Sequence, residues 1–296
     1  MVATPLVVGW SQRSRRRGHA TDSQLPRWVF YAVGSLIALL FASPLLWVLI
    51  NSLKSPTELA QSPPTYLPHQ VTGESYHQLA AIGIWPYIRN SLTVTLGADI
   101  AVVVISTLAG YGFARFRFAG KAALFLVLLS TLMIPFQSII TPLYLILRNL
   151  GLTNSLLGLV LIYTTFFLPF SVFVMRNSFA AVPDALEEAA MLDGCGTLAT
   201  LTRVMLPLAL PGVVTVALYG FFSAWNEFFA ALIFLNTEDE YTLPILLTNV
   251  ETGLYGNINW GILETGVVVT MLPCIAVFLL LQRYYLTGMT AGATKG

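Results

Sequence analysis

Six long apolar segments constrain the fold of this chain more than any other feature. A helix that crosses the hydrocarbon core of a bilayer needs roughly 20 mostly apolar residues. The segments that meet this requirement are Trp28 to Leu53, Ser91 to Ala114, Ala122 to Leu147, Leu156 to Met175, Leu206 to Leu235, and Ile262 to Leu286. We therefore expect an all-α integral membrane protein with six transmembrane helices.

The composition is typical of an integral membrane protein, because 56% of the residues are hydrophobic and only 10% are charged. Average soluble domains have about a quarter of their residues charged. The first segment follows the basic cluster Arg15, Arg16 and Arg17, as a signal peptide would. It is too long for a secretory apolar region and lacks a convincing cleavage site, so we interpret it as an uncleaved first span.

The basic residues set the expected orientation, since cytoplasmic loops carry an excess of Lys and Arg. With the N-terminus inside, twelve of the fifteen Lys and Arg residues lie on the cytoplasmic side. The outer set is Lys54, Arg89 and Arg148. We expect both termini in the cytoplasm, a basic tail at 1–27, a permease domain at 28–286 and a second tail at 287–296.

The sequence gives little support for a disulfide, a metal site or an enzymatic activity. Cys195 and Cys274 fall at different depths, and the three histidines show no ligand spacing, so we predict no disulfide and no metal site. Nothing resembles a phosphate-binding glycine loop, so we expect the chain neither to bind ATP nor to act as an enzyme. An intramembrane enzyme would also need a nucleophile–base pair or metal ligands at membrane depth, and no histidine lies there. A nucleic-acid partner is not expected.

The polar loop at 176–205 carries the most specific pattern. Pro183 and Asp184 suit a helix start, and Gly194 suits a left-handed C-cap. Between them, an apolar stripe lies beside a polar side that carries Glu187 and Glu188. The stripe is Ala185, Ala189 and Leu192. A second short helix is expected from about Thr197. By residue pattern alone, an amphipathic helix on the membrane surface remains an alternative.

The spacing in this loop resembles the EAA loop of the membrane-spanning subunits of ABC importers. Glu188-Ala189-Ala190 is followed after three residues by Gly194, after nine more by Val204, and then by Leu206-Pro207. Further stretches are similar to the carbohydrate-uptake permeases, of the type of the maltose system's G permease. They are SPLLW and NSLK near the first span, IPFQ and TPLY in the third, WNEF in the fifth, and the C-terminal LTGMTAGATKG.

The resemblance implies a type I ABC importer transmembrane domain in a bacterial cell membrane. The partners it implies are a second homologous permease, two ATPase subunits that bind ATP and Mg, an extracellular solute-binding protein, a sugar or oligosaccharide, and membrane lipid. An importer of a polyol or glycerol phosphate is the main alternative. A secondary transporter is less favoured, because only Asp99 and Glu227 lie well inside the apolar segments.

The resemblance also assigns roles to residues. ATPase coupling falls to Glu188, Ala189, Ala190, Asp193 and Gly194, with Asp193 alternatively a local cap. A tail that contacts the ATPase includes Gly292, Lys295 and Gly296, although a disordered tail is the alternative. An outer loop that contacts the binding protein contains Gly253, Tyr255, Gly256 and Asn257, with a plain connection as the alternative.

A carboxylate within an apolar segment must face protein or a wet cavity, because ionised groups are costly at membrane depth. We therefore expect Trp225, Asn226 and Glu227 to line a sugar pathway, with Gln137 and Tyr163 from other spans. Amide and carboxylate groups satisfy sugar hydroxyls, and an aromatic face covers the apolar side of the ring. The alternative is a structural carboxylate that ties the fifth span to its neighbours.

Overall fold

The computed structural model describes residues 26–253 and 258–293, and every regular element in these ranges is a helix. The α-helices are α1 (Arg27–Ser52), α2 (Pro56–Leu59), α3 (Glu74–Ala81), α4 (Trp85–Arg115), α5 (Lys121–Ser130), α6 (Phe136–Asn149), α7 (Leu156–Ala180), α8 (Asp184–Leu192), α9 (Thr197–Thr200), α10 (Leu206–Leu208), α11 (Leu210–Trp225), α12 (Phe229–Phe234), α13 (Leu243–Glu251) and α14 (Trp260–Ala293). Short 3-10 turns lie at Thr131–Met133 and Glu238–Glu240, and a π-helical turn at Leu201–Met205.

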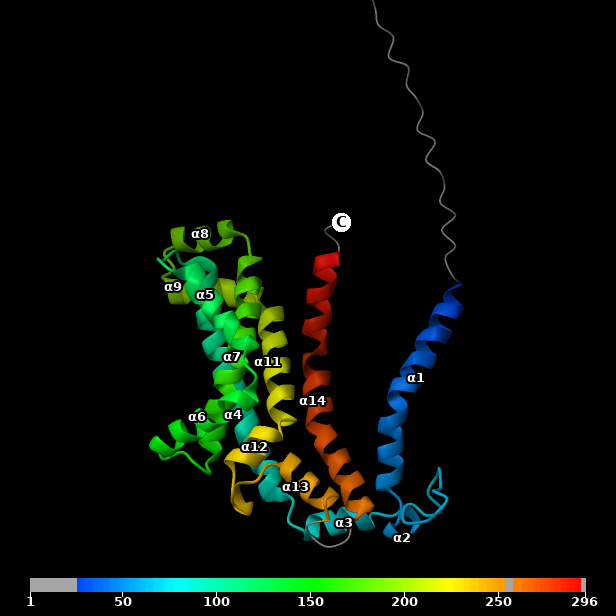
Figure 1. Ribbon diagram of the computed structural model, residues 1–296. Coiled ribbons are helices and arrows are strands. Elements are labelled where there is room, and N and C mark those ends of the chain that lie inside the picture. The colour runs from blue at the N-terminus through cyan, green and yellow to red at the C-terminus, as the bar shows by residue number, and fades with distance from the viewer. Residues whose placement is uncertain (1–25, 254–257, 294–296) are drawn as a thin grey trace, which may run out of the picture. The chain divides into compact units, whose positions relative to one another are not determined.

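The chain divides into two compact units, one ending at Trp47 and the other beginning at Val48. The described part of the first unit is most of α1, a helix whose large apolar side chains are exposed. The second unit holds all the remaining helices and every predicted site residue that the structure describes. Figure 1 identifies the helices by label and colour.

Four helices are individually long and apolar enough to cross a membrane, namely α1, α4, α7 and α14. Two bent pairs meet the same criterion as pairs, which gives six spans if each pair is one span. The predicted all-α membrane fold is therefore confirmed. The predicted third and fifth segments, however, are not continuous straight helices.

The break in the third segment lies between Lys121–Met133 and Phe136–Asn149, which meet at 105°. Its cause is Pro135, because a residue before proline is disfavoured in the helical region. Ile134 accordingly adopts an extended conformation with ψ 115°. The single span expected from Ala122 to Leu147 is thus wrong in its geometry.

The fifth segment also differs from the expectation of one helix over Leu206 to Leu235. Its helices bend by 79° at Ala209, just before Pro211 in the first turn of α11. A second interruption follows α11, where Asn226, Glu227 and Phe228 separate it from α12. Glu227 therefore lies in a helix break rather than within a helix.

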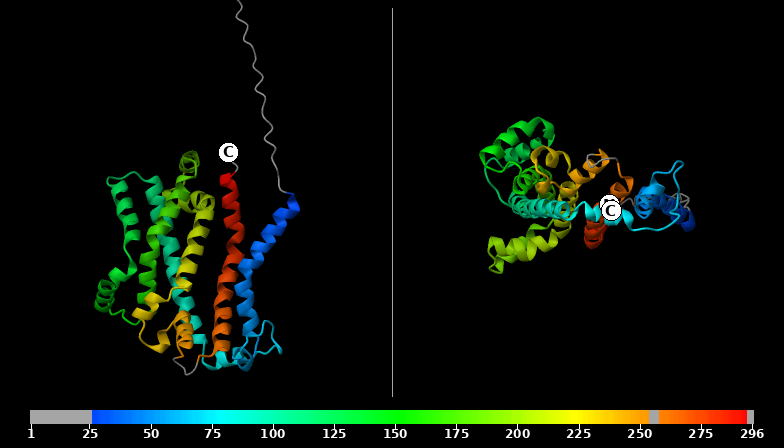
Figure 2. Two further views of the ribbon diagram at one scale, coloured as in Figure 1. Left: turned by 45° about the vertical axis from the view of Figure 1, so that its right-hand side comes forward. Right: turned by 90° about the horizontal axis from the view of Figure 1, so that it is seen from below.

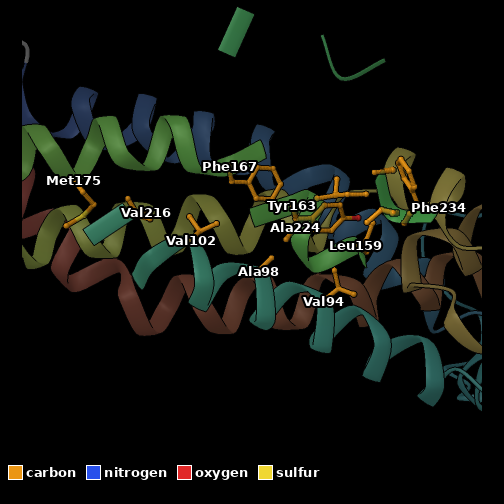
Figure 3. Packing of buried hydrophobic residues seen from close by; sticks show 14 of the residues in the cluster. Val94, Ala98, Val102, Leu159, Tyr163, Phe167, Met175, Val216, Ala224 and Phe234 are labelled. Carbon is orange, nitrogen blue, oxygen red and sulfur yellow. The ribbon is translucent and has the colours of Figure 1, made fainter. Parts of the chain in front are cut away.

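The core of the second unit lies between α4, α7 and α11. Val94, Ala98 and Val102 recur every four residues on α4, and α7 presents Leu159, Tyr163 and Phe167 at the same spacing. Figure 3 shows these side chains between the helices, together with Val216 and Ala224 from α11. This spacing places each set on one face of its helix, so the two sets bury one another.

Glycines allow the closest approaches between these helices, as small residues do in membrane bundles. A Cβ at Gly110 of α4 would overlap Met175 Cβ and lie 2.9 Å from the backbone nitrogen of Arg176 on α7. A Cβ at Gly220 of α11 would overlap the Asp99 carboxylate of α4. The Asp99 side chain therefore faces a helix interface.

The short helices of the second unit gather at its two ends. Figure 1 and the left view of Figure 2 show α8 and α9 at one end, with α3, α12 and α13 at the other. The C-terminal end of α14 lies at the same end as α8. The stretch between the fifth and last apolar segments contains α13, whose Leu243, Ile245 and Leu246 are fully buried. Much of it is therefore packed structure rather than an open loop.

Candidate functional site

The helix α8 forms as its sequence predicts. It begins at Asp184 after Pro183, which holds an extended conformation, and its C-cap is Asp193. Gly194 then adopts φ 84°, which confirms the predicted left-handed position. The amide of Gly194 donates to the Met191 carbonyl, and the amide of Cys195 to the Ala190 carbonyl, at 3.0 Å each. This pair of bonds is the Schellman motif, which satisfies carbonyls at the helix end.

The two faces of α8 are assigned differently from the prediction. Glu187 and Ala190 are the buried residues, whereas the predicted apolar stripe is exposed. Leu192 of that stripe is 88% exposed. The prediction placed Glu187 on the same polar side as Glu188. This is wrong, because Glu187 is buried against the bundle, where two residues of α4 supply partners for its carboxylate. Glu188 and Ala189 are exposed beside Leu186, Met191 and Leu192.

Arg115 and Tyr111 of α4 hold Glu187 against the bundle. The Tyr111 hydroxyl donates to Glu187 Oε1 at 2.6 Å, and Arg115 Nε lies 3.1 Å from Glu187 Oε2. The second contact is an ion pair without hydrogen-bond alignment. Both charged side chains are nearly buried, Arg115 at 9% and Glu187 at 11% exposure.

The same guanidinium also reaches the chain that leads into α8. Arg115 donates to the carbonyls of Phe179, at 2.8 Å, and Val182, at 2.5 Å, and it pairs with Asp184. One side chain at the end of α4 therefore connects the end of α7 with the start of α8. These contacts hold α8 to the bundle, while Leu186, Met191 and Leu192 remain exposed.

A pocket of about 270 Å³ lies at the other end of the bundle and brings together three of the five predicted pathway residues. Gln137, Tyr163 and Glu227 all line it. The Tyr163 hydroxyl donates to Glu227 Oε2 at 2.6 Å. The remaining walls are mostly aromatic, from Phe136, Phe166, Phe167 and Phe229. These rings carry no signal in the sequence beyond their aromatic type.

Glu227 also has a structural role. Its Oε1 accepts from the amide of Ala230 at 2.9 Å, and its Oε2 from the amide of Ala231 at 3.2 Å. Both amides belong to the first turn of α12, where helix donors lack helical partners. The carboxylate thus ties α12 to α7 through Tyr163, as the structural alternative expected, while still lining the pocket.

Trp225 and Asn226 do not join this pocket. Trp225 is 1% exposed, stacks on Phe221 at 5.9 Å between centroids, and donates from Nε1 to the Thr270 carbonyl of α14. Asn226 donates to the Phe222 carbonyl at 2.9 Å. The reason is that α11 ends at Trp225, so these neighbours do not share a direction with Glu227. Of these three neighbours only Glu227 is among the described residues that line this pocket, and a place for Trp225 and Asn226 on the sugar pathway stays a prediction.

The outer loop and the tail are described only in part. Gly253 has φ 71°, as a tight turn requires, whereas Tyr255, Gly256 and Asn257 lie outside the described residues. Gly292 falls within α14, which continues beyond the predicted end of the last span, and Lys295 and Gly296 also lie outside the described residues. After Gly253 the described chain resumes at 258, where the Asn259 amide group donates to Gln78 Oε1 of α3 at 3.0 Å.

A helical membrane bundle that presents an exposed two-helix elbow and encloses a small polar–aromatic pocket defines a transport permease subunit. The profile of the family described as "Binding-protein-dependent transport system inner membrane component" matches residues 101–290. The chain belongs to this family and is a multi-pass membrane protein.

Several similar proteins are named as permeases of saccharide uptake systems. The diacetylchitobiose uptake system permease protein DasC of Streptomyces coelicolor is 34% identical over 266 residues, covering 90% of this chain and 95% of that protein. The trehalose/maltose transport system permease protein MalG of Thermococcus litoralis is 31% identical, covering 88% and 94%. The predicted resemblance to carbohydrate ABC permeases is confirmed.

The fold is similar to that of a chain in the crystal structure of a bacterial ABC transporter that imports the acidic polysaccharide alginate. The TM-score is 0.75 at 22% identity, covering 88% of this chain and 96% of that chain. At this level of identity the likeness concerns the fold alone.

Proposed function

We propose that this chain is one permease subunit of an ATP-driven, binding-protein-dependent sugar importer, in which it forms half of the translocation pathway. The observation that carries the proposal is the exposed elbow of α8 and α9, held to the bundle by Arg115. An exposed apolar surface beside the exposed carboxylate of Glu188 suits a protein partner. The partner proposed for it is an ATPase subunit that binds ATP and Mg.

The coupling mechanism follows from the contacts of α8. A displacement of α8 by the ATPase reaches α4 through Tyr111 and Arg115, and α7 through the carbonyls that Arg115 holds. Helices α4 and α7 form the core that leads to the pocket at Tyr163. ATP-driven closure of the ATPase pair would therefore move the helices that carry the pocket, without a chemical step in this chain.

The complete importer would need a second homologous permease, two ATPase subunits and an extracellular solute-binding protein. In this arrangement the end with α8 faces the cytoplasm, as the distribution of Lys and Arg favours. Both termini would then be cytoplasmic, and the segment near Gly253 would face the binding protein.

A sugar is the proposed cargo for two reasons. Named relatives carry sugars, and the pocket combines aromatic faces with the amide of Gln137 and the carboxylate of Glu227. No Lys or Arg is among the described residues that line this pocket, which disfavours glycerol phosphate. A polyol remains the alternative within the same class.

Uptake into proteoliposomes tests this proposal. The permease pair, its ATPase and its binding protein would be reconstituted with labelled disaccharides, a polyol and glycerol phosphate. We expect ATP-dependent uptake of a sugar only when the binding protein is present. Uptake without ATP, driven by an ion gradient, would contradict the proposal, and preferential uptake of glycerol phosphate would contradict the assigned cargo.

A further inference from the structure

A basic groove of about 810 Å³ lies at the α8 end of the bundle, apart from the coupling elbow and the pocket. It runs between the turn after α4, the first turns of α5, and α7. Its polar groups are the side chains of Lys121 and Arg176, and the described residues that line it include no Asp or Glu.

Arg176 of α7 is fixed in this groove by an aromatic ring. Its Cζ lies 4.4 Å from the centroid of Phe125 on α5. Stacking engages the face of a guanidinium and leaves the N–H donors at its edge for an anion. Within the described residues, no carboxylate lies within ion-pair distance of Arg176, so the charge is not neutralised by this part of the chain.

Lys121 supplies the second cation from the start of α5. Its ammonium donates to the carbonyls of Phe116, at 3.0 Å, and Ala114, at 3.4 Å, at the end of α4. Carbonyl oxygens hold the ammonium in place but carry no formal charge. A lysine has three donors, so one remains for a further acceptor.

Apolar side chains continue the groove along α5. Phe118, Leu126 and Leu129 line it beside the two cations, and Leu126 is 68% exposed. A small soluble anion would use the cations but gain nothing from this wall. An amphiphile with an anionic head uses both, and basic sites between transmembrane helices on the cytoplasmic side suit anionic headgroups.

We propose that the groove binds an anionic phospholipid, with its phosphate between Lys121 and Arg176 and an acyl chain along Leu126 and Leu129. The bound headgroup would connect the start of α5 to the end of α7. Because α7 leads directly into α8, the lipid would stabilise the segment that positions the coupling elbow.

The test uses the assembled importer in nanodiscs of phosphatidylcholine, with and without phosphatidylglycerol. Native mass spectrometry measures retained phosphatidylglycerol, and thermal unfolding measures its effect on stability. The double variant Lys121→Gln/Arg176→Gln should bind phosphatidylglycerol about thirtyfold more weakly, from roughly two lost basic contacts with the headgroup. It should also lose the rise in melting temperature that phosphatidylglycerol gives to the parent.

The matched control is Arg117→Gln/Arg148→Gln, which removes the same charge from exposed positions that do not line the groove. It should retain parental lipid binding, as should the charge-preserving variant Lys121→Arg, which leaves the stacked guanidinium of Arg176 in place. Equal loss in the Arg117/Arg148 control, or undiminished binding in the Gln double variant, would overturn the proposal. Inorganic phosphate that raises the melting temperature in phosphatidylcholine discs as much as phosphatidylglycerol would overturn the assignment to a lipid.

Discussion

Arg115 Nε lies 3.1 Å from Glu187 Oε2, so the last residue of α4 is paired with the buried face of α8. Two adjacent glutamates thereby take different positions. Glu187 faces the bundle, and Glu188 faces outward beside Leu192. Glu187 therefore positions the elbow, and Glu188 is the residue proposed for docking.

Substitution of each glutamate by alanine separates these roles. Glu187→Ala leaves Tyr111 and Arg115 without their buried acceptor, so we expect destabilisation of about 1–3 kcal/mol. Glu188→Ala should change stability by no more than about 0.5 kcal/mol, because its side chain is exposed. Thermal unfolding of the purified permease pair without the ATPase measures both. Equal destabilisation by the two variants would contradict the assignment.

Gly194 can be tested through its backbone alone, since a Cβ there would meet nothing within 4 Å. Its φ of 84° disfavours a β-branched residue by about 1–2 kcal/mol, whereas asparagine tolerates this region. We expect Gly194→Val to lower binding-protein-stimulated ATPase activity and uptake, while Gly194→Asn largely preserves both. If the two variants behave alike, the left-handed turn is not what positions the elbow.

Gly110 and Gly112 offer a matched pair on α4. Gly110→Ala would force Met175 and the α7 backbone to move, at a cost of about 1–3 kcal/mol. Gly112→Ala meets no atom within 4 Å and should be neutral or stabilising, since alanine favours helix. The melting temperatures of the two variants measure this difference. A neutral Gly110→Ala would show that α4 and α7 are not in close contact there.

The pocket is best tested at Gln137, which lines it and whose side chain joins no other helix by a hydrogen bond within the part of the chain that the structure describes. Gln137→Ala should raise the KM for sugar uptake or change sugar preference, with assembly unchanged. Tyr163→Phe and Glu227→Gln disturb the contact to α12 as well, so we expect both to lower stability and uptake. Parental sugar kinetics in Gln137→Ala would argue against a sugar in this pocket.

The segment that follows α1 should respond to acid. Burial of Glu58 opposes its ionisation. Its carboxylate, however, accepts hydrogen bonds from the Thr65 hydroxyl and from the amide and ring of His69. Together with the charge of His69, these bonds hold the pKa of Glu58 below 4.5. Because the pKa of Glu58 is lower in the folded segment than in the unfolded chain, its ionisation stabilises the folded segment at pH values above the unfolded pKa. This stabilisation is lost as the pH falls through the folded pKa. The protection factors for amide exchange in residues 55–72, which are corrected for the intrinsic pH dependence of exchange, should therefore fall in acid, and less so in Glu58→Gln.

The sequence predicts those features that depend on local backbone chemistry or on overall hydropathy. Pro183, Asp184 and Gly194 predict the ends of α8 because capping rules act within a few residues. The existence of the apolar segments follows from their length. Pro135 and Pro211 mark the places of the two bends in the sequence, but the bend angles depend on packing against other helices.

The sequence could not predict which face of α8 is buried. Hydrophobic periodicity indicates that apolar residues face the bundle, whereas here the bundle supplies Tyr111 and Arg115 to a carboxylate and leaves Leu192 exposed. The sequence likewise favours one shared environment for Trp225 and Glu227, because they lie only two residues apart. The end of α11 between them gives each a different environment, and that break depends on tertiary contacts.

Photocrosslinking from Leu192 tests the central claim most directly, because this side chain is 88% exposed on the proposed docking face. A photoreactive amino acid would replace Leu192 in the assembled importer, with Leu150, exposed beyond the end of α6, as the control position. We expect a crosslink from position 192 to the ATPase subunit and none from position 150, with mass spectrometry identifying the joined peptides. If position 192 forms no crosslink to the ATPase subunit in a complex that hydrolyses ATP and transports its sugar, the proposed docking face is wrong.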